Sequence, residues 1–366
     1  MPTYKDEKTG LWYCKFVYKD WTGKSIQKKK KGFKLQREAK EWELEFLNKY
    51  SGTVDMKFRY FVEIYLADCK VRLKPTTYPG KENMFRKHIL PYFGEMKLNK
   101  ITATTVRQWQ TVMMSNPKKF KKTYLKSIHN QLSALFNYAC KYYGLPENPA
   151  KVCGSMGRSK ADKMDFWTLD EFKQFEEAIS DKIISKTIFN LLYWSGMRSG
   201  ELMALTLGDF DFEAQAVEIN KNYARLDRED LILEPKTPKS NRRVSLPTHV
   251  CELVKDYANR LVDYEDGERL FEVTKGFLYH EMERGCKKSG VKRIRVHDVR
   301  HSHASLLIEM EISVLYISER LGHEDIQTTL EIYAHLYPNK NEQVMDKLNA
   351  LWVVSRVMRK IIFTVW

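Results

Sequence analysis

The stretch Leu321–Leu336 reads LGHEDIQTTLEIYAHL, and the interpretation of the whole chain depends on it. Its apolar residues recur at the spacing of an amphipathic helix, and it carries two histidines and one tyrosine. Tyr333 is therefore either an aromatic residue packed in a core or a nucleophile. Nothing inside the stretch distinguishes these interpretations, so the answer depends on the groups that the rest of the chain brings to the tyrosine hydroxyl.

Composition restricts the class of protein. The chain has 366 residues, which predicts two or three domains, and 43% of them are hydrophobic, enough to form real cores. The net charge is +15 at pH 7. Such an excess of lysine and arginine favours a polyanionic partner, most simply nucleic acid. A basic soluble protein without such a partner is the alternative that composition leaves open.

The cysteines and the chain ends predict a cytoplasmic protein with no membrane partner. The six cysteines form no Cys-x-x-Cys pair, which is typical of reduced thiols rather than of a disulfide framework or a zinc site. The N-terminal residues contain no apolar run typical of a signal peptide. Residues 351–366 are apolar, but Arg356, Arg359 and Lys360 interrupt them and the segment is too short to span a bilayer. We expect this segment to pack on a protein surface.

Residues 1–55 predict a small α+β unit. Segments 10–20 and 24–33 have the composition of two strands, with a turn between them. A helix follows, with an apolar stripe of Ala39, Trp42 and Phe46. The second strand carries the densest positive charge of the chain, Lys28, Lys29, Lys30 and Lys31. This run is either a solvated surface or a sheet face that binds DNA phosphates.

Residues 56–150 predict a bundle of about four helices, and a separate domain is expected after them. Pro91 and Gly94 are expected to end the second helix, and Gly144 the last one. Residues 151–164 are rich in Gly, Ser and Lys and are typical of a linker. A new domain then begins at residue 165, where Thr168 and Glu171 have the spacing of a capping box.

Four short segments of this last domain carry reactive side chains. SGMRSGEL at 195–202 places Arg198 after a helix end and Glu201 on the next helix. LILEPKTPKSNRRVSLP at 231–247 predicts a β-hairpin with its turn at 237–241 and Lys236 close to the tip. HDVRHSHAS at 297–305 puts His297 and Arg300 on one helical face, and His323 follows a Leu-Gly pair.

Each segment alone has an ordinary structural explanation. An arginine at a helix junction is usually an ion-pair partner, and a lysine at a hairpin tip is usually solvated. His297 and His301 are four residues apart, but no nearby Glu or Cys completes a familiar zinc pattern, so we expect no metal. His301 and His303 are expected to be packing or capping groups.

Together these residues suit one task, which is to hold a phosphodiester while a hydroxyl attacks it. Two arginines can bind the non-bridging oxygens, and histidines can donate hydrogen bonds or transfer protons. A lysine can protonate the leaving oxygen, and a tyrosine can form the covalent phosphoryl link. Fixed cations can stabilise the transferring phosphoryl group without a metal, and the chain has no phosphate-binding loop for ATP. The sequence therefore predicts no cofactor.

In this order and at these spacings, the segments resemble those of the tyrosine recombinases, the phage integrase family. The resemblance extends to the N-terminal unit, which is similar to the arm-DNA-binding domain of integrases from phages and conjugative elements, and to the helical unit, which is similar to their SAM-like core-binding domain. It implies a multidomain, mainly α protein with a small α+β N-terminal domain and a mostly α catalytic domain with a β-hairpin or small sheet. The implied division is arm-binding domain 1–55, core-binding domain 56–150, linker 151–164, catalytic domain 165–345 and C-terminal tail 346–366.

The resemblance also implies a role for each matching residue. Tyr333 would attack the scissile phosphate and form a 3′-phosphotyrosyl intermediate, while Arg198 and Arg300 bind that phosphate. Lys236 would be the general acid for the 5′ oxygen, with Lys239 as the alternative. The remaining roles are proton transfer with the tyrosine for His297, a hydrogen bond to a phosphate oxygen for His323, and support of the arginine and histidine groups for Glu201.

The function implied is site-specific recombination that integrates and excises a mobile element in a bacterial cell. The implied partners are double-stranded DNA with core and arm attachment sites, three further copies of the chain in a homotetramer on DNA, and accessory DNA-bending or directionality proteins. Two other functions compete with this one: a non-catalytic DNA-binding regulator and a type IB topoisomerase. The complete set of reactive residues disfavours the regulator, and the arm-like N-terminus disfavours the topoisomerase.

The link Glu324–Thr329 is expected to be flexible enough to switch a protomer on or off.

Overall fold

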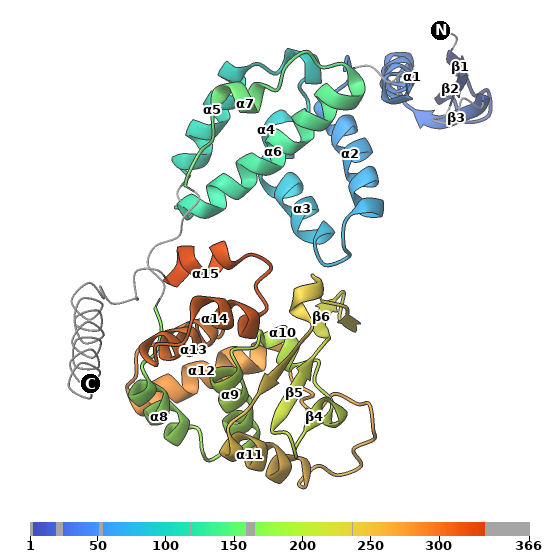
Figure 1. Cartoon of the computed structure of the whole chain (residues 1–366). Helices are drawn as coiled ribbons and strands as arrows, with labels where there is room; N and C mark the ends of the chain where they lie inside the picture. Colours follow the sequence, from blue (N-terminus) through green and yellow to red (C-terminus); the bar gives the residue numbers. More distant parts are fainter. Residues whose placement is uncertain are drawn as a thin grey trace, which may run out of the picture. The chain divides into compact units, whose positions relative to one another are not determined.

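The chain forms two compact units, Met1–Asp162 and Lys163–Trp366, and each is described by itself (Figure 1). The structure is a computed structural model that describes residues 3–19, 25–50, 54–116, 119–158, 165–235 and 237–333. The apolar C-terminal segment 351–366 and Lys236 lie outside the described residues. Within the described part of the chain, no helix is both long enough and apolar enough to cross a bilayer.

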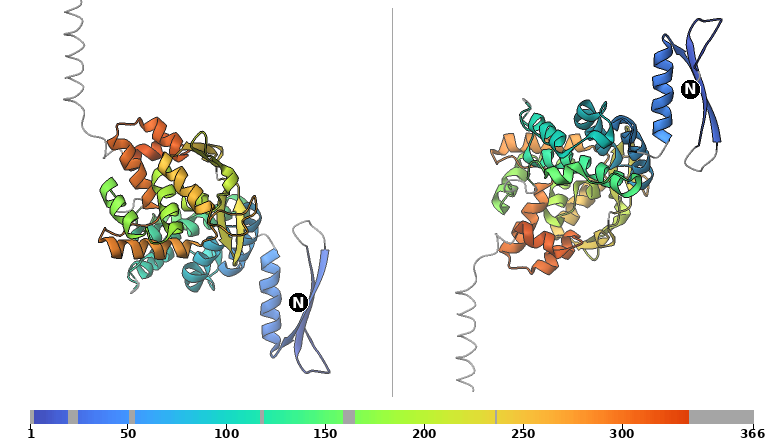
Figure 2. Two further views of the ribbon diagram at one scale, coloured as in Figure 1. Left: turned by 90° about the horizontal axis from the view of Figure 1, so that it is seen from below. Right: turned by 90° about the horizontal axis from the view of Figure 1, so that it is seen from above.

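The first unit begins with a three-stranded antiparallel sheet covered on one face by a helix, as predicted (Figure 2). The strands are β1 (Thr3–Lys5), β2 (Trp12–Lys19) and β3 (Ser25–Phe33), in the order β1-β2-β3, and the helix is α1 (Gln36–Tyr50). Cys14 is fully buried between them. The rings of Phe16 and Tyr18 on β2 lie 5.3 and 4.9 Å from the ring of Phe46 on α1. The predicted apolar stripe of the helix therefore packs on alternate residues of the strand.

The strand alternation divides the lysine run of β3 between the two faces of the sheet. Lys28 and Lys30 pair with Phe16 and Cys14, which face α1, and the Lys28 ammonium lies 5.7 Å from the ring of Phe46. Lys29 instead lies on the open face, where its ammonium is 4.5 Å from the ring of Tyr13. Lys31 shares that open face and pairs with Asp6 at 2.9 Å. The open face thus presents fewer cations than the sequence run contains.

A bulge in β3 keeps the aromatic residues on the helix side. The register shifts between Trp12 and Tyr13, and Gly32 has a φ of +98°. This conformation suits glycine, and the extra residue returns Phe33 to the covered face. The Phe33 ring accordingly lies 6.1 Å from the ring of Trp42 on α1.

The rest of the first unit is helical. Its elements are α2 (Phe58–Arg72), α3 (Tyr78–Met84), the π-helical turn η1 (Phe85–Ile89), α4 (Leu90–Phe93), the 3₁₀ turn η2 (Leu98–Lys100), α5 (Ala103–Met114), α6 (Lys122–Tyr143) and α7 (Pro149–Cys153). Thr102 caps α5, and Gly144 ends α6 as predicted, in the left-handed conformation with φ +71°. The core is aromatic and aliphatic, and includes Phe58, Phe61, Phe93, Trp109, Leu132 and Phe136.

Pro91 does not end the second helical segment, contrary to the prediction. The helical path continues through α3, η1 and α4, and Pro91 occupies the first turn of α4. A proline is tolerated there because its missing N–H is not needed by the new turn. The preceding turn widens into a π-helix in which the Leu90 N–H donates to the Phe85 carbonyl. The segment ends one turn later, at Gly94.

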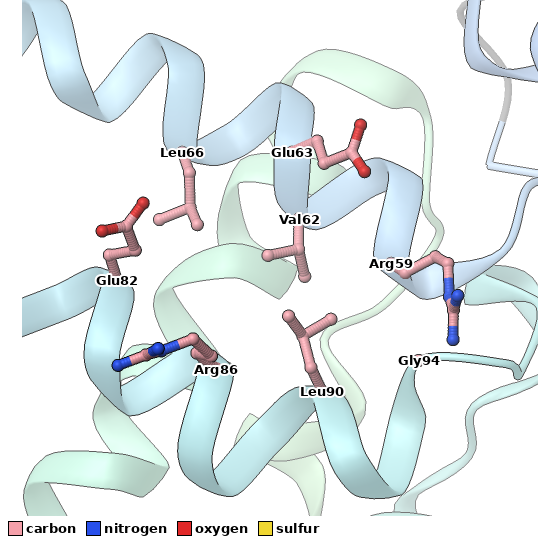
Figure 3. A pocket seen from close by; sticks show the side chains of 8 residues that line it. All are labelled: Arg59, Val62, Glu63, Leu66, Glu82, Arg86, Leu90 and Gly94. Atoms are coloured by element: carbon pink, nitrogen blue, oxygen red, sulfur yellow. The ribbon is translucent and has the colours of Figure 1, made fainter.

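A pocket of about 360 Å³ opens beside α2, η1 and α4 in this unit (Figure 3). Its apolar lining comes from Val62, Leu66 and Leu90. The charged residues around it are two arginines and two glutamates, namely Arg59, Arg86, Glu63 and Glu82. Because these charges balance, the pocket offers no excess positive charge to a polyanion.

The second unit is mainly helical with two small sheets (Figure 1). Its helices and helical turns are α8 (Leu169–Ala178), α9 (Ile183–Ser195), α10 (Ser199–Leu202), η3 (Leu207–Asp209), η4 (Pro238–Ser240), α11 (Thr248–Ala258), α12 (Lys275–Ser289), α13 (Asp298–Glu309), α14 (Val314–Leu321) and α15 (Ile326–Tyr333). Its strands are β4 (Phe210–Asp211), β5 (Ala216–Ile219), β6 (Asn222–Leu226), β7 (Glu229–Leu233) and β8 (Arg242–Ser245). Thr168 and Glu171 form the predicted capping box of α8. The mainly α, multidomain fold class is thereby confirmed.

The predicted hairpin around residues 237–241 is wrong. Strand β7 pairs with β6, while β8 pairs with β5 in the sheet β4-β5-β8. The hairpin lies one strand earlier, where Asp227 and Arg228 form a two-residue turn with φ values of +51° and +73°. Such a turn matches the twist of paired strands and closes β6 on β7. Segment 234–241 is therefore a connection between two sheets, and Lys239 lies in its 3₁₀ turn η4.

Candidate active site

The candidate site is built where two helices end at left-handed glycines. Helix α9 ends before Gly196, with φ +68°, and α14 ends before Gly322, with φ +67°. A Cβ atom on Gly196 would lie 2.6 Å from Cδ2 of His303, so this close contact also requires glycine. The last carbonyls of both helices are left without intrahelical partners and are available to side-chain donors.

Arg300 connects these two helix ends. It comes from α13, is 3% exposed, and donates from Nη1 to the Gly196 carbonyl at 2.8 Å and from Nη2 to the Leu321 carbonyl at 2.5 Å. A cation is stabilised at a helix C-terminus by the partial negative charge of these carbonyls. The guanidinium of Arg300 is therefore held in one place by the backbone.

Arg198 approaches the same turn from α10. Its Nη2 donates to the Gly322 carbonyl at 3.4 Å, and its Nη1 donates to Oε1 of Glu201 at 2.7 Å. The backbone N–H of Arg198 also donates to the other oxygen of Glu201, at 2.8 Å. The Arg198 side chain nevertheless remains 35% exposed. Arg198 is an ion-pair partner, which is the ordinary structural role of an arginine at a helix junction. Its side chain is also accessible to a ligand from solvent.

Glu201 is a buried carboxylate shared by two arginines. It is 5% exposed, and Arg242 on β8 donates to its oxygens from Nη2 at 2.8 Å and from Nη1 at 3.2 Å. Burial alone would raise the pKa of Glu201, but the hydrogen bonds and charges of Arg242, and then of Arg198, lower it to about 2. Glu201 is therefore ionised at neutral pH and fixes both guanidinium groups.

His323 is neutral and is oriented by a buried threonine. Its Nδ1 lies 2.7 Å from Oγ1 of Thr329, which is fully buried at the beginning of α15. Burial, followed by the positive charges of Arg300 and Arg198, lowers the pKa of His323 to about 3. If the threonine hydroxyl donates to Nδ1, the ring carries its proton on Nε2 and can donate it to an anion.

The other histidines lie around Arg300. His297 is the N-cap residue of α13, and its ring centroid lies 5.2 Å from that of His301. Loss of hydration around the ring, followed by the charge of Arg300, lowers the pKa of His297. His301 and His303 are buried, as expected for packing groups, and His303 Nε2 accepts from Arg320 at 3.0 Å.

Of the two lysine candidates and the tyrosine, the structure describes the side chain of Lys239 only. Lys236 lies outside the described residues, and Lys239 donates from Nζ to the Glu324 carbonyl at 2.8 Å. Tyr333 is the residue at which α15 ends in the described part of the chain, and its side chain is not among the described ones. The contact of Lys239 therefore joins the segment after Lys236 to the segment that leads into the tyrosine helix.

Sequence reasoning missed Arg242 and Thr329. A signal for Arg242 was present, because it shares the inward face of its strand with Val244, which is 1% exposed. An arginine at an inward strand position is typical of a buried ion pair, since a charge in a core needs a partner. Thr329 carried no such signal, because its partner is six residues away and on a different element.

Taken together, Arg198, Arg300 and His323 converge on the turn Leu321–His323, and we call these three residues the phosphate site. The two guanidinium groups bind consecutive carbonyls of that turn, and the histidine follows directly. Two cations beside a neutral imidazole donor suit a tetrahedral oxyanion with several non-bridging oxygens. Among the described residues, no three His, Cys, Asp or Glu side chains come together in a way that could hold a metal ion.

Comparison with protein families matches three separate stretches of the chain. Residues 165–340 match the phage integrase family, residues 57–114 the N-terminal SAM-like domain of phage integrases, and residues 2–50 an arm DNA-binding domain. The chain is 31% identical to the ICEBs1 integrase of Bacillus subtilis over 332 residues, which cover 87% of this chain and 88% of the relative. It is 25% identical to a XerC-like tyrosine recombinase of Caldanaerobacter subterraneus, covering 92% of this chain and 95% of the relative.

Solved structures show the same fold. The Tn1549 transposon integrase in complex with transposon right end DNA matches with a TM-score of 0.67 at 19% identity, over 79% of this chain and 99% of that one. A lambda integrase tetramer bound to a Holliday junction matches with a TM-score of 0.55 at 18% identity, over 89% of this chain and 96% of that one. The fold and the relatives define a DNA strand-exchange enzyme of the tyrosine type. The chain belongs to the phage integrase family and is a tyrosine-type site-specific recombinase.

Proposed function

We propose that this chain integrates and excises a mobile element by cutting and rejoining DNA through a 3′-phosphotyrosyl intermediate. The observation that carries the proposal is the convergence of Arg198, Arg300 and His323 on one turn, ten residues before Tyr333 in the sequence. A phosphate held by these groups would lie at the turn that leads into α15, and α15 ends at Tyr333 in the described part of the chain. The hydroxyl of Tyr333 is the nucleophile that the family motif requires. The proposal assigns to Tyr333 the role of nucleophile.

The reaction follows from the chemistry of these groups. The Tyr333 oxygen attacks the scissile phosphorus, a P–O bond to tyrosine forms, and the P–O5′ bond breaks. The tyrosine proton passes to a base, for which we propose His297, and the leaving 5′ oxygen takes a proton from Lys236, with Lys239 as the alternative. Attack of a 5′-hydroxyl from the partner duplex on the phosphotyrosyl bond then reverses these steps. The bond energy is kept in the ester, so no ATP is consumed.

The phosphate site stabilises the charge of the transferring group. Arg198 and Arg300 donate to the non-bridging oxygens, and His323 adds a neutral donor. Glu201 takes no part in bond making and instead holds the guanidinium groups of Arg198 and Arg242 through hydrogen bonds. Because Glu201 and Arg300 are both nearly fully buried, little reorganisation is needed when the charge develops.

We also propose DNA-binding roles for the other parts of the chain. The proposed division is an arm-binding domain at 1–55, a core-binding domain at 56–150, a linker at 151–164, a catalytic domain at 165–345 and a tail at 346–366. The family matches at 2–50, 57–114 and 165–340 support the three domains of this proposal. Within the arm-binding domain, the open sheet face with Lys29 and Tyr13 is the proposed phosphate contact. Double-stranded DNA, a homotetramer on that DNA and accessory DNA-bending or directionality proteins are the proposed partners, in the cytoplasm of a bacterial host. The solved lambda integrase tetramer on a Holliday junction is consistent with four copies.

The test of the nucleophile is covalent capture on a suicide substrate, a nicked attachment site from which the cut fragment diffuses away. Tyr333→Phe should bind this DNA but form no protein–DNA adduct in a denaturing gel. Tyr257→Phe is the matched control, because its ring is buried on α11 in the same unit, and this variant should form adducts like the wild type. An adduct with Tyr333→Phe would refute the assignment.

The same preparation separates the competing functions. A non-catalytic regulator would bind the attachment site and form no adduct even as wild type. A type IB topoisomerase would relax supercoiled DNA without dependence on the attachment-site sequence. A recombinase should join two attachment sites and ignore DNA that lacks them.

A further inference from the structure

Arg242 contacts three parts of the catalytic unit that the proposed reaction has to keep together. It lies on β8 with its side chain 6% exposed. Besides its two hydrogen bonds to Glu201, it donates from Nη1 to the Ser240 carbonyl at 3.0 Å and from Nε to the Arg320 carbonyl at 2.8 Å. A planar guanidinium with its donors in fixed directions can serve several acceptors at once, which an ammonium group cannot do in the same geometry.

The first contact leads to the phosphate site. Arg242 and Arg198 share the same carboxylate, since each donates to Oε1 of Glu201 and Arg242 also donates to Oε2. The position of Glu201, and through it the position of Arg198, therefore depends on the strand that carries Arg242.

The second contact leads to the segment that follows Lys236. Ser240 is 5% exposed, its N–H donates to the Thr237 carbonyl at 3.0 Å, and its hydroxyl lies 3.1 Å from that of Thr237. Thr237 is the direct neighbour of Lys236 in the chain. The backbone on one side of the proposed general acid is thus joined to Arg242 through a short turn that ends at the buried Ser240.

The third contact leads to the end of α14 and so to His323. The Arg320 carbonyl accepts from Arg242, and a Cβ atom on Gly322 would lie 3.0 Å from Nη1 of Arg242 and 3.2 Å from the Lys239 carbonyl. Glycine at this position lets the turn of the phosphate site approach both Arg242 and the η4 segment closely.

We infer that Arg242 is a positioning residue that sets the segment carrying Lys236 against the phosphate site, so that the leaving 5′ oxygen is protonated. The inference rests on the proposed function, in which Lys236 is the general acid. Strand β7 ends at Leu233 and β8 begins at Arg242, so none of the described residues between them is held by strand pairing. The hydrogen bond from Arg242 to Ser240 anchors it at its C-terminal end.

The inference predicts a defect that depends on the leaving group. In DNA with sulfur in place of the bridging 5′ oxygen, tyrosine attack forms the same P–O bond but breaks a P–S bond. The departing thiolate belongs to a thiol with a pKa of about 8.5 and needs no proton, whereas an alkoxide does. A variant that misplaces the general acid should therefore cleave the oxygen substrate slowly and the sulfur substrate nearly normally.

The variant to test is Arg242→Lys, which keeps a positive charge beside Glu201 but cannot serve all the acceptors. We expect its rate of adduct formation to fall about 100-fold on oxygen DNA and less than about 10-fold on sulfur DNA. Arg243→Lys is the matched control on the same strand, because Arg243 is exposed and pairs with Asp211 at 2.5 Å, and it should behave as wild type on both. Lys236→Met should show the same sulfur rescue and calibrates its size.

A second variant tests the chain of contacts without touching the ion pair. Ser240→Ala removes the hydroxyl contact with Thr237, and we expect about a 10-fold loss on oxygen DNA that sulfur restores. An equal loss on both substrates in Arg242→Lys, or no loss on oxygen DNA in Ser240→Ala, would overturn the inference. If Arg242→Lys fails to fold, the rates of Ser240→Ala on oxygen and sulfur DNA alone test the inference. Failure of the proposed function is a different result, because wild-type protein would then form no adduct with either substrate.

Discussion

Replacement of Glu201 by glutamine should destabilise the catalytic unit by about 3 kcal/mol at neutral pH. The pKa of Glu201 is about 2 in the folded protein, compared with an ordinary value of 4.5. One pKa unit corresponds to about 1.4 kcal/mol, so ionisation of this carboxylate stabilises the fold by about 3 kcal/mol. The amide also leaves the guanidinium of Arg242 buried without a counter-charge, and breaking a buried pair costs about 3–5 kcal/mol.

The assay is unfolding by heat or denaturant at pH 7. For a unit of this size, about 3 kcal/mol lowers Tm by about 6–12 °C. Asp256→Asn is the matched control, because Asp256 and Arg260 form an exposed pair at 2.9 Å on α11, and its effect should stay within about 0.5 kcal/mol.

The pH dependence has a definite sign. The folded state lowers the pKa of Glu201, so its contribution is fully present above about 4.5 and is lost as the pH falls through about 2. The stability difference between wild type and Glu201→Gln should therefore shrink over that interval. A difference below about 1 kcal/mol at pH 7, or one that grows on acidification, would refute the reasoning.

Three further outcomes are expected. Gly322→Ala should lower stability by about 1–3 kcal/mol more than Gly290→Ala in denaturant unfolding, because both have positive φ but only the first meets atoms within 4 Å. His323→Ala should slow adduct formation about 10- to 100-fold. The wild-type rate between pH 5 and 8 should show no ionisation of His323, since its pKa is about 3. A step in the pH–rate profile of the wild type that is absent from the profile of the variant would contradict this. Lys29→Ala should weaken the binding of arm-site DNA and reduce the salt dependence of the binding constant by about one charge. Lys28→Ala should change both quantities less, because Lys28 faces α1. Binding isotherms at several salt concentrations would show the larger effect for Lys28→Ala if the covered face bound DNA.

Local sequence determined much of this protein. The helix ends at Gly144 and Gly196 and the cap at Thr168 follow from backbone and side-chain chemistry within a few residues, and these were predicted. The reactive segments and their order were also sufficient to indicate the family, because each segment is short and keeps its residues at fixed spacing.

Strand partners and buried contacts were decided by the tertiary structure alone. Strand β7 pairs with β6 and not with β8, because a two-residue turn at 227–228 joins β6 directly to β7, while β8 pairs with β5. The lysine run was one feature in the sequence, yet the pleat of β3 and its pairing with β2 divide it between two faces.

The same distinction applies to the candidate site. The sequence predicted a site with Arg198, Arg300 and His323 from the segments that carry them, whereas the contacts of Arg242 and Thr329 are made with residues distant in the chain or on another element. Local patterns record which backbone shape a segment prefers, because propensity, capping and alternation act over a few residues. Hydrogen-bond partners across elements depend on which surfaces meet in the folded core, and that is determined when the whole chain packs.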